Sequence, residues 1–239
     1  PDRMGEFCHR YMLGLYRILE ELTARFPEVL FENCSSGGGR FDPGMSFYMP
    51  QTWCSDNTDA LDRQSIQYGA SYVFPPSAIA AHVSAVPNHQ TGRMIPFKTR
   101  AGLASSANMG YELNVLDFSD EERKQVLEHL AEYKEERELI FNGAFYRLRS
   151  PFEGNCCAWM LTDQRREKAI LYAFAASYNV SCLSMVLKIP YLDQKKLYTE
   201  QNTGRQFSGE ELRCAGLAVQ FSQGDFPAVK IVLQTEPMS

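Results

Sequence analysis

Hydrophobic and polar positions follow two different patterns along the chain, and the change falls near residue 145. Residues 4–25 carry apolar side chains at helical spacing, which predicts a helix. A short apolar run at 28–32 predicts a strand, and a glycine-rich loop follows at 33–40. Helix, strand and loop in this order are typical of an α/β barrel or a doubly wound sheet, in which chemistry sits on loops after the strands.

The same order of elements repeats as far as residue 144. We predict strand regions at 47–53, at 71–75 and within 96–103, and helices at 58–68 and 119–141. The last helix has a well-marked start, because Ser119 and Glu122 have the spacing of a capping box.

After residue 145 the pattern is one of short strand-like runs separated by turn residues, as in an antiparallel sandwich. We predict strands at 146–148, 157–161, 168–174, 186–189, 216–218 and 229–233. The fold class predicted from both patterns is α/β followed by antiparallel β. Its two domains would be residues 1–144 and residues 145–239.

Composition argues against a nucleic-acid partner and against a membrane-spanning segment. The chain has 239 residues, 44% of them hydrophobic, which is enough for one large core or two smaller ones. Its 24 Lys and Arg against 29 Asp and Glu give a net charge of −5, and no long basic run indicates a nucleic-acid partner. No apolar stretch approaches the roughly 18 residues of a membrane span. The chain opens on Pro1 without a signal peptide, so we expect it to begin inside a longer protein.

The cysteines favour a reducing compartment and no metal. There are seven, an odd number, and their spacings match no zinc pattern. Cys156 and Cys157 are adjacent, which suits neither a tetrahedral site nor an easy disulfide. Reduced thiols in a cytoplasmic protein are the simplest interpretation.

The loop at 33–40 is the first candidate site. Its three successive glycines would let the backbone approach a ligand closely and offer N–H donors. A Walker loop would need Gly-Lys-Ser/Thr after the glycines, and a dinucleotide loop would need Gly-x-Gly-x-x-Gly; neither is present. The residues therefore match neither phosphate-binding pattern, and a ligand contact and a flexible loop remain open on these residues alone.

Asp56 is the second candidate. A carboxylate just past a strand and close to a Trp, here Trp53, is how glycosidases often place an acid/base, because the aromatic ring lowers the local polarity. The alternative is that Asp56 and Asp59 cap the helix that follows. Trp53 could stack on a sugar or pack under the loop.

Other polar residues carry weaker signals. His82 and His89 lie in a loop rich in Pro and Asn, where they could support the loop or contact a ligand. Asp59 and Asp62 are interpreted as solvated helix residues. Asp42, before Pro-Gly, is interpreted as a turn residue.

Three segments together carry a family resemblance. They are Glu-Asn-Cys-Ser-Ser-Gly-Gly-Gly-Arg-Phe-Asp-Pro-Gly-Met at 32–45, Tyr-Met-Pro-Gln-Thr-Trp-Cys-Ser-Asp-Asn-Thr-Asp-Ala at 48–60, and His-Val-Ser-Ala-Val-Pro-Asn-His-Gln at 82–90. They resemble glycoside hydrolase family 36 α-galactosidases. The resemblance is continuous from about 31 to 114 and weaker towards the end of the chain. One departure is Cys54, where a small hydroxyl residue is more usual.

The resemblance implies the C-terminal half of a (β/α)₈ TIM barrel followed by an antiparallel β-sandwich domain. It makes Asp56 the catalytic acid/base and places Cys34 and Gly37 on the loop that lines the galactose pocket. The family's nucleophile is an aspartate in a Lys-Trp-Asp-Met-Asn-like segment, which does not occur in this sequence.

The implied function is hydrolysis of terminal α-galactosides such as raffinose-type oligosaccharides and melibiose, with retention and without a metal or organic cofactor. The family further implies a homo-oligomer, a tetramer, and the cysteines indicate a cytoplasmic location. Because the nucleophile segment is absent, we expect the 239-residue chain to be inactive alone. A non-catalytic galactoside-binding module and a purely structural fragment are the alternatives.

Overall fold

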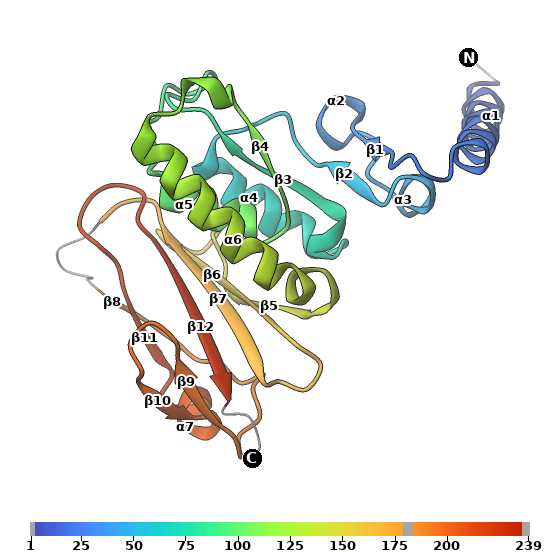
Figure 1. Ribbon diagram of the computed structural model, residues 1–239. Helices are drawn as coiled ribbons and strands as arrows, with labels where there is room; N and C mark the ends of the chain where they lie inside the picture. Colours follow the sequence, from blue (N-terminus) through green and yellow to red (C-terminus); the bar gives the residue numbers. More distant parts are fainter. Residues whose placement is uncertain (1–2, 179–183, 236–239) are drawn as a thin grey trace. The chain divides into compact units, whose positions relative to one another are not determined.

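The computed structural model describes residues 3–178 and 184–235. The chain forms two compact units, residues 1–56 and residues 57–239 (Figure 1). Each unit is described by itself below.

The described residues of the first unit, 3–56, form three helices and two short strands. They are α1 (Met4–Arg25), β1 (Glu32–Asn33), α2 (Ser35–Gly38), α3 (Pro43–Tyr48) and β2 (Gln51–Trp53). Helix α1 confirms the prediction at 4–25. The predicted strand at 28–32 is wrong except for its last residue, because the apolar run before it stays in solvent and Leu30 is 91% exposed.

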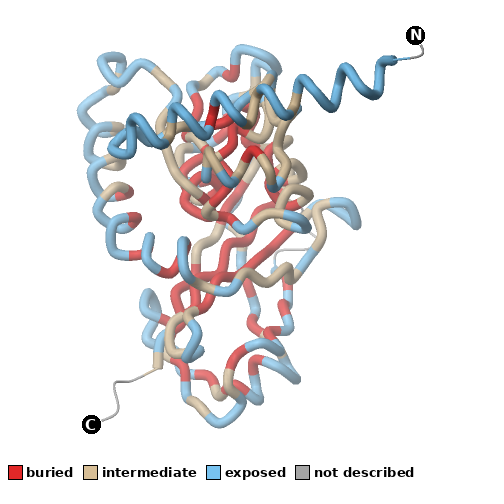
Figure 2. The backbone as a smooth tube through the Cα atoms, turned by 90° about the vertical axis from the view of Figure 1, so that its right-hand side faces the viewer, coloured by how far each residue is buried: buried red, intermediate tan, exposed pale blue. Residues whose placement is uncertain are grey.

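The first unit buries few apolar side chains. Only Leu19 of α1 is buried, and Figure 2 shows the helix exposed along most of its length. Met45 and Trp53 are the other buried apolar residues among those described in this unit. Asp42 begins α3, where its side chain accepts a hydrogen bond from the Met45 N–H at 3.0 Å, so it is a helix cap rather than a simple turn residue.

The second unit begins with parallel strands alternating with helices. Its elements are α4 (Ala60–Ala70), η1 (Pro76–Ala78), β3 (Ile79–Ser84), α5 (Phe97–Ser105), β4 (Asn108–Glu112), η2 (Val115–Asp117) and α6 (Asp120–Asn142). Strands β3 and β4 pair in parallel, from Ala80 opposite Asn108 to Ser84 opposite Glu112. The predicted capping box is present at the start of α6, with Ser119 and Glu122 hydrogen-bonded in both directions.

Two strand predictions in this region are wrong. Residues 71–75 form a turn in which Tyr72 and Val73 are exposed, and the strand begins only at Ile79. The region 96–103 belongs to helix α5, whose start follows Pro96. Buried Arg100 holds this helix in place, because its side chain donates hydrogen bonds to the carbonyl of Ser84 on β3, at 2.6 Å, and to the nearby carbonyl of Ile95, at 2.9 Å.

An antiparallel region follows α6. Its elements are β5 (Ala144–Arg149), β6 (Cys156–Thr162), β7 (Lys168–Ala175), β8 (Ser184–Leu187), β9 (Leu197–Glu200), β10 (Gln206–Ser208), α7 (Gly209–Cys214), β11 (Leu217–Gln220) and β12 (Ala228–Thr235). Six strands form one sheet in the order β10-β9-β12-β7-β6-β5, and β11 pairs with β8. Each of the six predicted strands has a counterpart, although the one at 186–189 overlaps β8 only at 186–187, while β9, β10 and α7 were not predicted.

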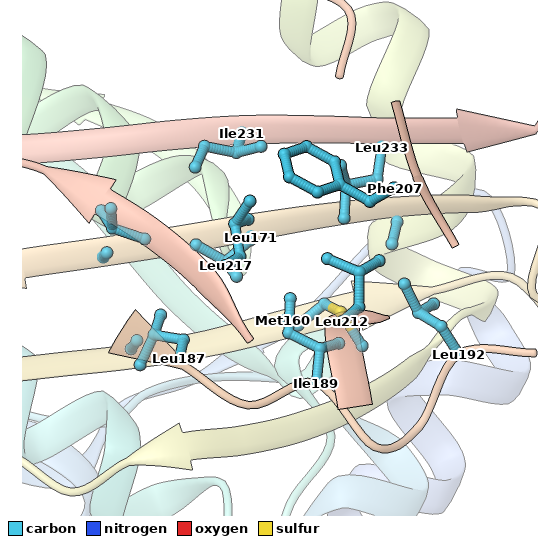
Figure 3. Close-up of a cluster of buried hydrophobic side chains, with 14 of the residues drawn as sticks. Met160, Leu171, Leu187, Ile189, Leu192, Phe207, Leu212, Leu217, Ile231 and Leu233 are labelled. Atoms are coloured by element: carbon cyan, nitrogen blue, oxygen red, sulfur yellow. The ribbon is translucent and has the colours of Figure 1, made fainter. Parts of the chain in front are cut away.

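The two faces of the six-stranded sheet are both apolar. Side chains alternate along β6, so Met160 faces one layer while Trp159 and Leu161 face the other. One face packs on β8, β11 and α7, and its side chains converge in Figure 3. The other face packs on α4, α5 and α6 (Figure 1).

This packing crosses the predicted domain boundary. The architecture changes between α6 and β5, as the pattern indicated, but the helices before residue 144 share a core with strands after it. The division into 1–144 and 145–239 therefore stays a prediction. Cys182 lies outside the described residues, and none of the other six cysteines forms a disulfide bond within the described part of the chain.

A buried histidine ties three elements of the second unit together. The imidazole of His129 on α6 lies 2.5 Å from the Ser105 hydroxyl of α5 and 2.6 Å from the Tyr111 hydroxyl of β4. Burial lowers the pKa of His129 to about 4, and the positive charge of Lys230 acts in the same direction.

We predict that protonation of His129 destabilises the folded protein in acid. The unfolded chain takes up this proton near pH 6.5 and the folded chain only near pH 4, so stability is lost as the pH falls through this interval. The loss should approach roughly 3 kcal/mol, at about 1.4 kcal/mol per pH unit. Denaturant unfolding at pH 7 and pH 4.5 should show a smaller loss in His129→Gln. His89→Gln, at an exposed histidine, is the control. An equal loss of unfolding free energy between pH 7 and pH 4.5 in the two variants would contradict the prediction.

Candidate active site on the loops after β1 and β2

The candidate site lies where two parallel strands end. Glu32 of β1 lies opposite Gln51 of β2, and Asn33 lies opposite Thr52. Because the strands run in the same direction, the loops that follow them leave from the same edge. These loops carry Cys34 after β1 and the segment 54–56 after β2.

The loop after β1 is a left-handed turn. Ser35 and Ser36 have φ of 54°, Gly37 has 70° and Gly38 has 95°. The turn is closed by hydrogen bonds from the Gly38 N–H to the Cys34 carbonyl and from the Gly39 N–H to the Ser35 carbonyl, both 3.0 Å. A left-handed conformation costs an L-residue about 1–2 kcal/mol, so the two serines are strained and the two glycines are not.

The glycines are also required by a close backbone contact. A Cβ at Gly37 would overlap the backbone nitrogen of Asp56 and lie 3.0 Å from the Ser55 carbonyl carbon. A Cβ at Gly38 would lie 2.8 Å from the Cys54 carbonyl oxygen. The turn therefore rests directly on the backbone of the segment that carries Asp56, and no side chain fits between them.

The first N–H groups of the turn remain available to a ligand. Among the described residues, the backbone N–H groups of Ser35, Ser36 and Gly37 donate to no protein acceptor. Cys34, which precedes them, is exposed. Both features support the predicted ligand-lining role of Cys34 and Gly37, which stays a prediction.

Asp56 is an exposed residue in a bend after β2. The helix cap that competed with a catalytic role is Asp59, whose carboxylate accepts hydrogen bonds from the N–H groups of Leu61 and Asp62 at 2.9 and 3.3 Å. Capping therefore does not account for Asp56. Trp53 is buried, as expected for core packing under the loop.

The prediction that Asp59 is a solvated helix residue is wrong. Asp59 is fully buried rather than solvated, and it accepts a hydrogen bond from the Thr91 hydroxyl at 2.5 Å and pairs with Arg93 at 3.0 Å. Burial raises the pKa of Asp59, but these partners and the backbone N–H groups outweigh it, so the pKa is lowered overall. Asp62, half-buried, also pairs with Arg93, at 3.2 Å.

The two histidines of the third segment lie in different elements. His82 belongs to strand β3 rather than to a loop, and its ring covers Gly110, where a Cβ would lie 2.7 Å from the ring. Its Nδ1 lies 3.6 Å from the Glu112 carboxylate. His89 is exposed in the loop after β3.

Two kinds of feature are absent from the described part of the chain. Residues 3–178 and 184–235 hold no group of three or more His, Cys, Asp or Glu side chains arranged to bind a metal ion. None of the helices in these ranges is long and apolar enough to cross a membrane.

Comparison with known proteins connects this geometry to a family. The Melibiase family model matches residues 1–143, and the model of the glycosyl hydrolase family 36 C-terminal domain matches residues 156–233. The chain belongs to glycoside hydrolase family 36. The resemblance carried by the three sequence segments is thereby confirmed.

Curated members of family 36 align with nearly the whole chain. Alpha-galactosidase AgaA of Geobacillus stearothermophilus is 49% identical over 226 residues, 95% of this chain and 31% of that protein. Alpha-galactosidase Mel36A of Lactobacillus acidophilus is 43% identical over 227 residues, again 95% of this chain and 31% of the relative. The chain thus spans about a third of the length of these family 36 relatives.

Solved family 36 structures share the fold. A variant of AgaA in complex with 1-deoxygalactonojirimycin superposes with a TM-score of 0.94 at 47% identity, over 99% of this chain and 33% of that chain. A second AgaA variant, in complex with raffinose, gives the same values. These matches confirm the predicted fold class, part of a TIM barrel followed by a β domain.

We predict that Gly37→Ala costs more stability than a substitution with the same backbone strain elsewhere. Gly92→Ala is the matched control, because its φ of 71° nearly equals the 70° of Gly37 and nothing lies within 4 Å of its Cβ position. Gly92→Ala should cost about 1 kcal/mol, and Gly37→Ala should cost clearly more because its Cβ overlaps the Asp56 backbone. Free energies of unfolding measure the difference, and equal costs would show that the backbone contact is not tight.

Proposed function

We propose that the protein to which this chain belongs is a retaining α-galactosidase that hydrolyses terminal α-galactosides, with Asp56 as its general acid/base. One observation carries this proposal: an exposed carboxylate follows β2 directly beside a glycine turn with unbonded N–H groups. Together they offer a proton donor and hydrogen-bond donors to one ligand. Family membership supports the reaction type, since the relatives described above are named alpha-galactosidases.

The reaction proceeds by double displacement. A carboxylate nucleophile attacks the anomeric carbon while Asp56 transfers its proton to the leaving oxygen, so the glycosidic bond breaks as a galactosyl-enzyme ester forms. Asp56, now ionised, removes a proton from water, and the water oxygen attacks the same carbon and releases galactose and the nucleophile. Two inversions give net retention, which requires the two carboxyl groups to lie about 5–5.5 Å apart.

The nucleophile is supplied from outside these 239 residues. The Lys-Trp-Asp-Met-Asn-like segment of the family does not occur in the sequence. The chain thus contributes the acid/base and one wall of the sugar pocket, formed by Cys34 and Gly37. In this role Cys34 shapes the pocket and Gly37 presents its N–H to a sugar oxygen.

The substrates proposed are raffinose-type oligosaccharides and melibiose. Solved variants of AgaA hold raffinose and stachyose, which supports galactosides of this class. The mechanism requires no metal or organic cofactor. A cytoplasmic location and a homotetrameric assembly stay predictions.

We predict that Asp56→Asn in the complete enzyme removes most activity on raffinose. An amide cannot protonate the sugar leaving group, whereas an activated aryl galactoside needs less acid assistance and its glycosylation should suffer less. Deglycosylation would still lack its base, so azide should restore turnover of p-nitrophenyl α-galactoside by acting as an external nucleophile. Steady-state rates with and without azide provide the measurement.

The control is Asp120→Asn, an exposed aspartate at the start of α6. It should keep wild-type rates on both substrates. Wild-type turnover of raffinose by Asp56→Asn would exclude Asp56 as the acid/base.

We predict that the 239-residue chain alone does not hydrolyse α-galactosides. Asp56 has no nucleophile within this sequence, and Asp59, the acidic residue nearest to it in the chain, is fully buried as a helix cap with its own partners. Addition of the missing polypeptide, as a separate chain or fused, should restore turnover of p-nitrophenyl α-galactoside. Turnover by the purified chain that disappears in Asp56→Ala would contradict the proposal that the nucleophile lies outside these 239 residues.

A further inference from the structure

Asn33 occupies the base of the glycine turn. It is the last residue of β1 and only 4% exposed. Its side-chain Nδ2 donates to the Arg40 carbonyl at 2.7 Å and to the Thr52 hydroxyl at 3.4 Å. Thr52 lies on β2 and is fully buried, so a buried amide group joins both strands and the far end of the loop.

The hydrogen bond to the Arg40 carbonyl joins the two ends of the loop. Asn33 directly precedes the loop and Arg40 ends it, so this hydrogen bond spans residues 34–39. Within that span Ser35 and Ser36 hold left-handed conformations that they would not adopt without constraint. The hydrogen bonds inside the turn fix its shape, whereas the Asn33 amide fixes where its two ends meet.

The bond to Thr52 connects this closed loop to the strand that leads to Asp56. Thr52 is followed by Trp53 and then by the segment 54–56, on whose backbone Gly37 and Gly38 rest. Loss of the Asn33 amide would leave the Arg40 carbonyl without this donor and would remove the side-chain hydrogen bond between the end of β1 and Thr52 of β2.

We propose that Asn33 is a positioning residue for the galactoside site: its buried amide holds the left-handed turn, with Cys34 and Gly37, against the Asp56 segment. Asn33 acts through the turn and does not contact the reacting atoms. The catalytic consequence rests on the proposed function, whereas the effect on the turn does not.

Two variants of the complete enzyme test this role. Asn33→Ala removes the donor, and Asn33→Asp keeps the shape but replaces the donor with a carboxylate. Asn33→Ala decides the outcome if the buried charge of Asn33→Asp prevents folding. Asn142→Ala is the control, because Asn142 is exposed on α6 and its amide donates to Glu138, one turn earlier on the same helix, at 2.8 Å.

The first readout is amide hydrogen exchange over residues 38–42, where the N–H groups of Gly38, Gly39 and Phe41 donate within the loop. Both Asn33 variants should exchange faster there, by about tenfold, while α6 exchanges as in the wild type. The second readout is kinetic. KM for raffinose should rise about tenfold with a smaller fall in kcat, because the loosened turn weakens sugar binding more than proton transfer by Asp56.

The two readouts separate the possible failures. Unchanged exchange over residues 38–42, or a fall in kcat at constant KM, would overturn the positioning role. If the wild-type enzyme itself hydrolysed no α-galactoside, the proposed function would fail, and hydrogen exchange would still decide whether Asn33 holds the turn.

Discussion

The contact between the glycine turn and the backbone of 54–56 is the constraint on which the candidate site depends. Two loops from neighbouring parallel strands meet with no side chain between them, and a single methyl group at Gly37 would overlap the Asp56 nitrogen. Gly37 and Gly38 therefore serve both to adopt positive φ and to allow the approach. The Asn33 side chain closes the same loop by its hydrogen bond to the Arg40 carbonyl. Because few apolar side chains of this unit are buried, hydrogen bonds and steric fit, rather than a large apolar core, shape it.

The second unit is held together differently. Its six-stranded sheet is apolar on both faces, with the β8–β11 ribbon and α7 on one side and helices α4 to α6 on the other. The βα elements and the antiparallel elements consequently share one core, although their sequence patterns differ sharply at residue 144. A structural unit defined by packing need not end where a sequence pattern ends, because a sheet with two apolar faces requires cover on both.

The residues of the candidate site differ in how far sequence reasoning could find them. Asp56, Cys34 and Gly37 stand in long, specific segments, and the order strand-loop-helix placed them on loops where chemistry is expected. The sequence left open which aspartate caps the helix, because Asp56 and Asp59 both precede it. Its burial depends on Thr91 and Arg93, more than thirty residues further along the chain. Asn33 gave no signal of its own, since its partners become visible only when β1 lies beside β2.

Local signals in the sequence were sufficient to predict helices α1 and α6, the capping box at Ser119, the central strands β6 and β7, and the motif residues around Asp56. Elements with an ambiguous local pattern could be assigned only from contacts in the folded chain. The segment 97–105 is a helix whose buried Arg100 donates a hydrogen bond to the Ser84 carbonyl on β3, and the apolar run 71–75 is a turn with exposed Tyr72 and Val73. The physical reason is the separation along the sequence of the residues that interact. Caps and hydrophobic periodicity act between residues a few positions apart, whereas burial and strand pairing join residues that only the folded chain brings together.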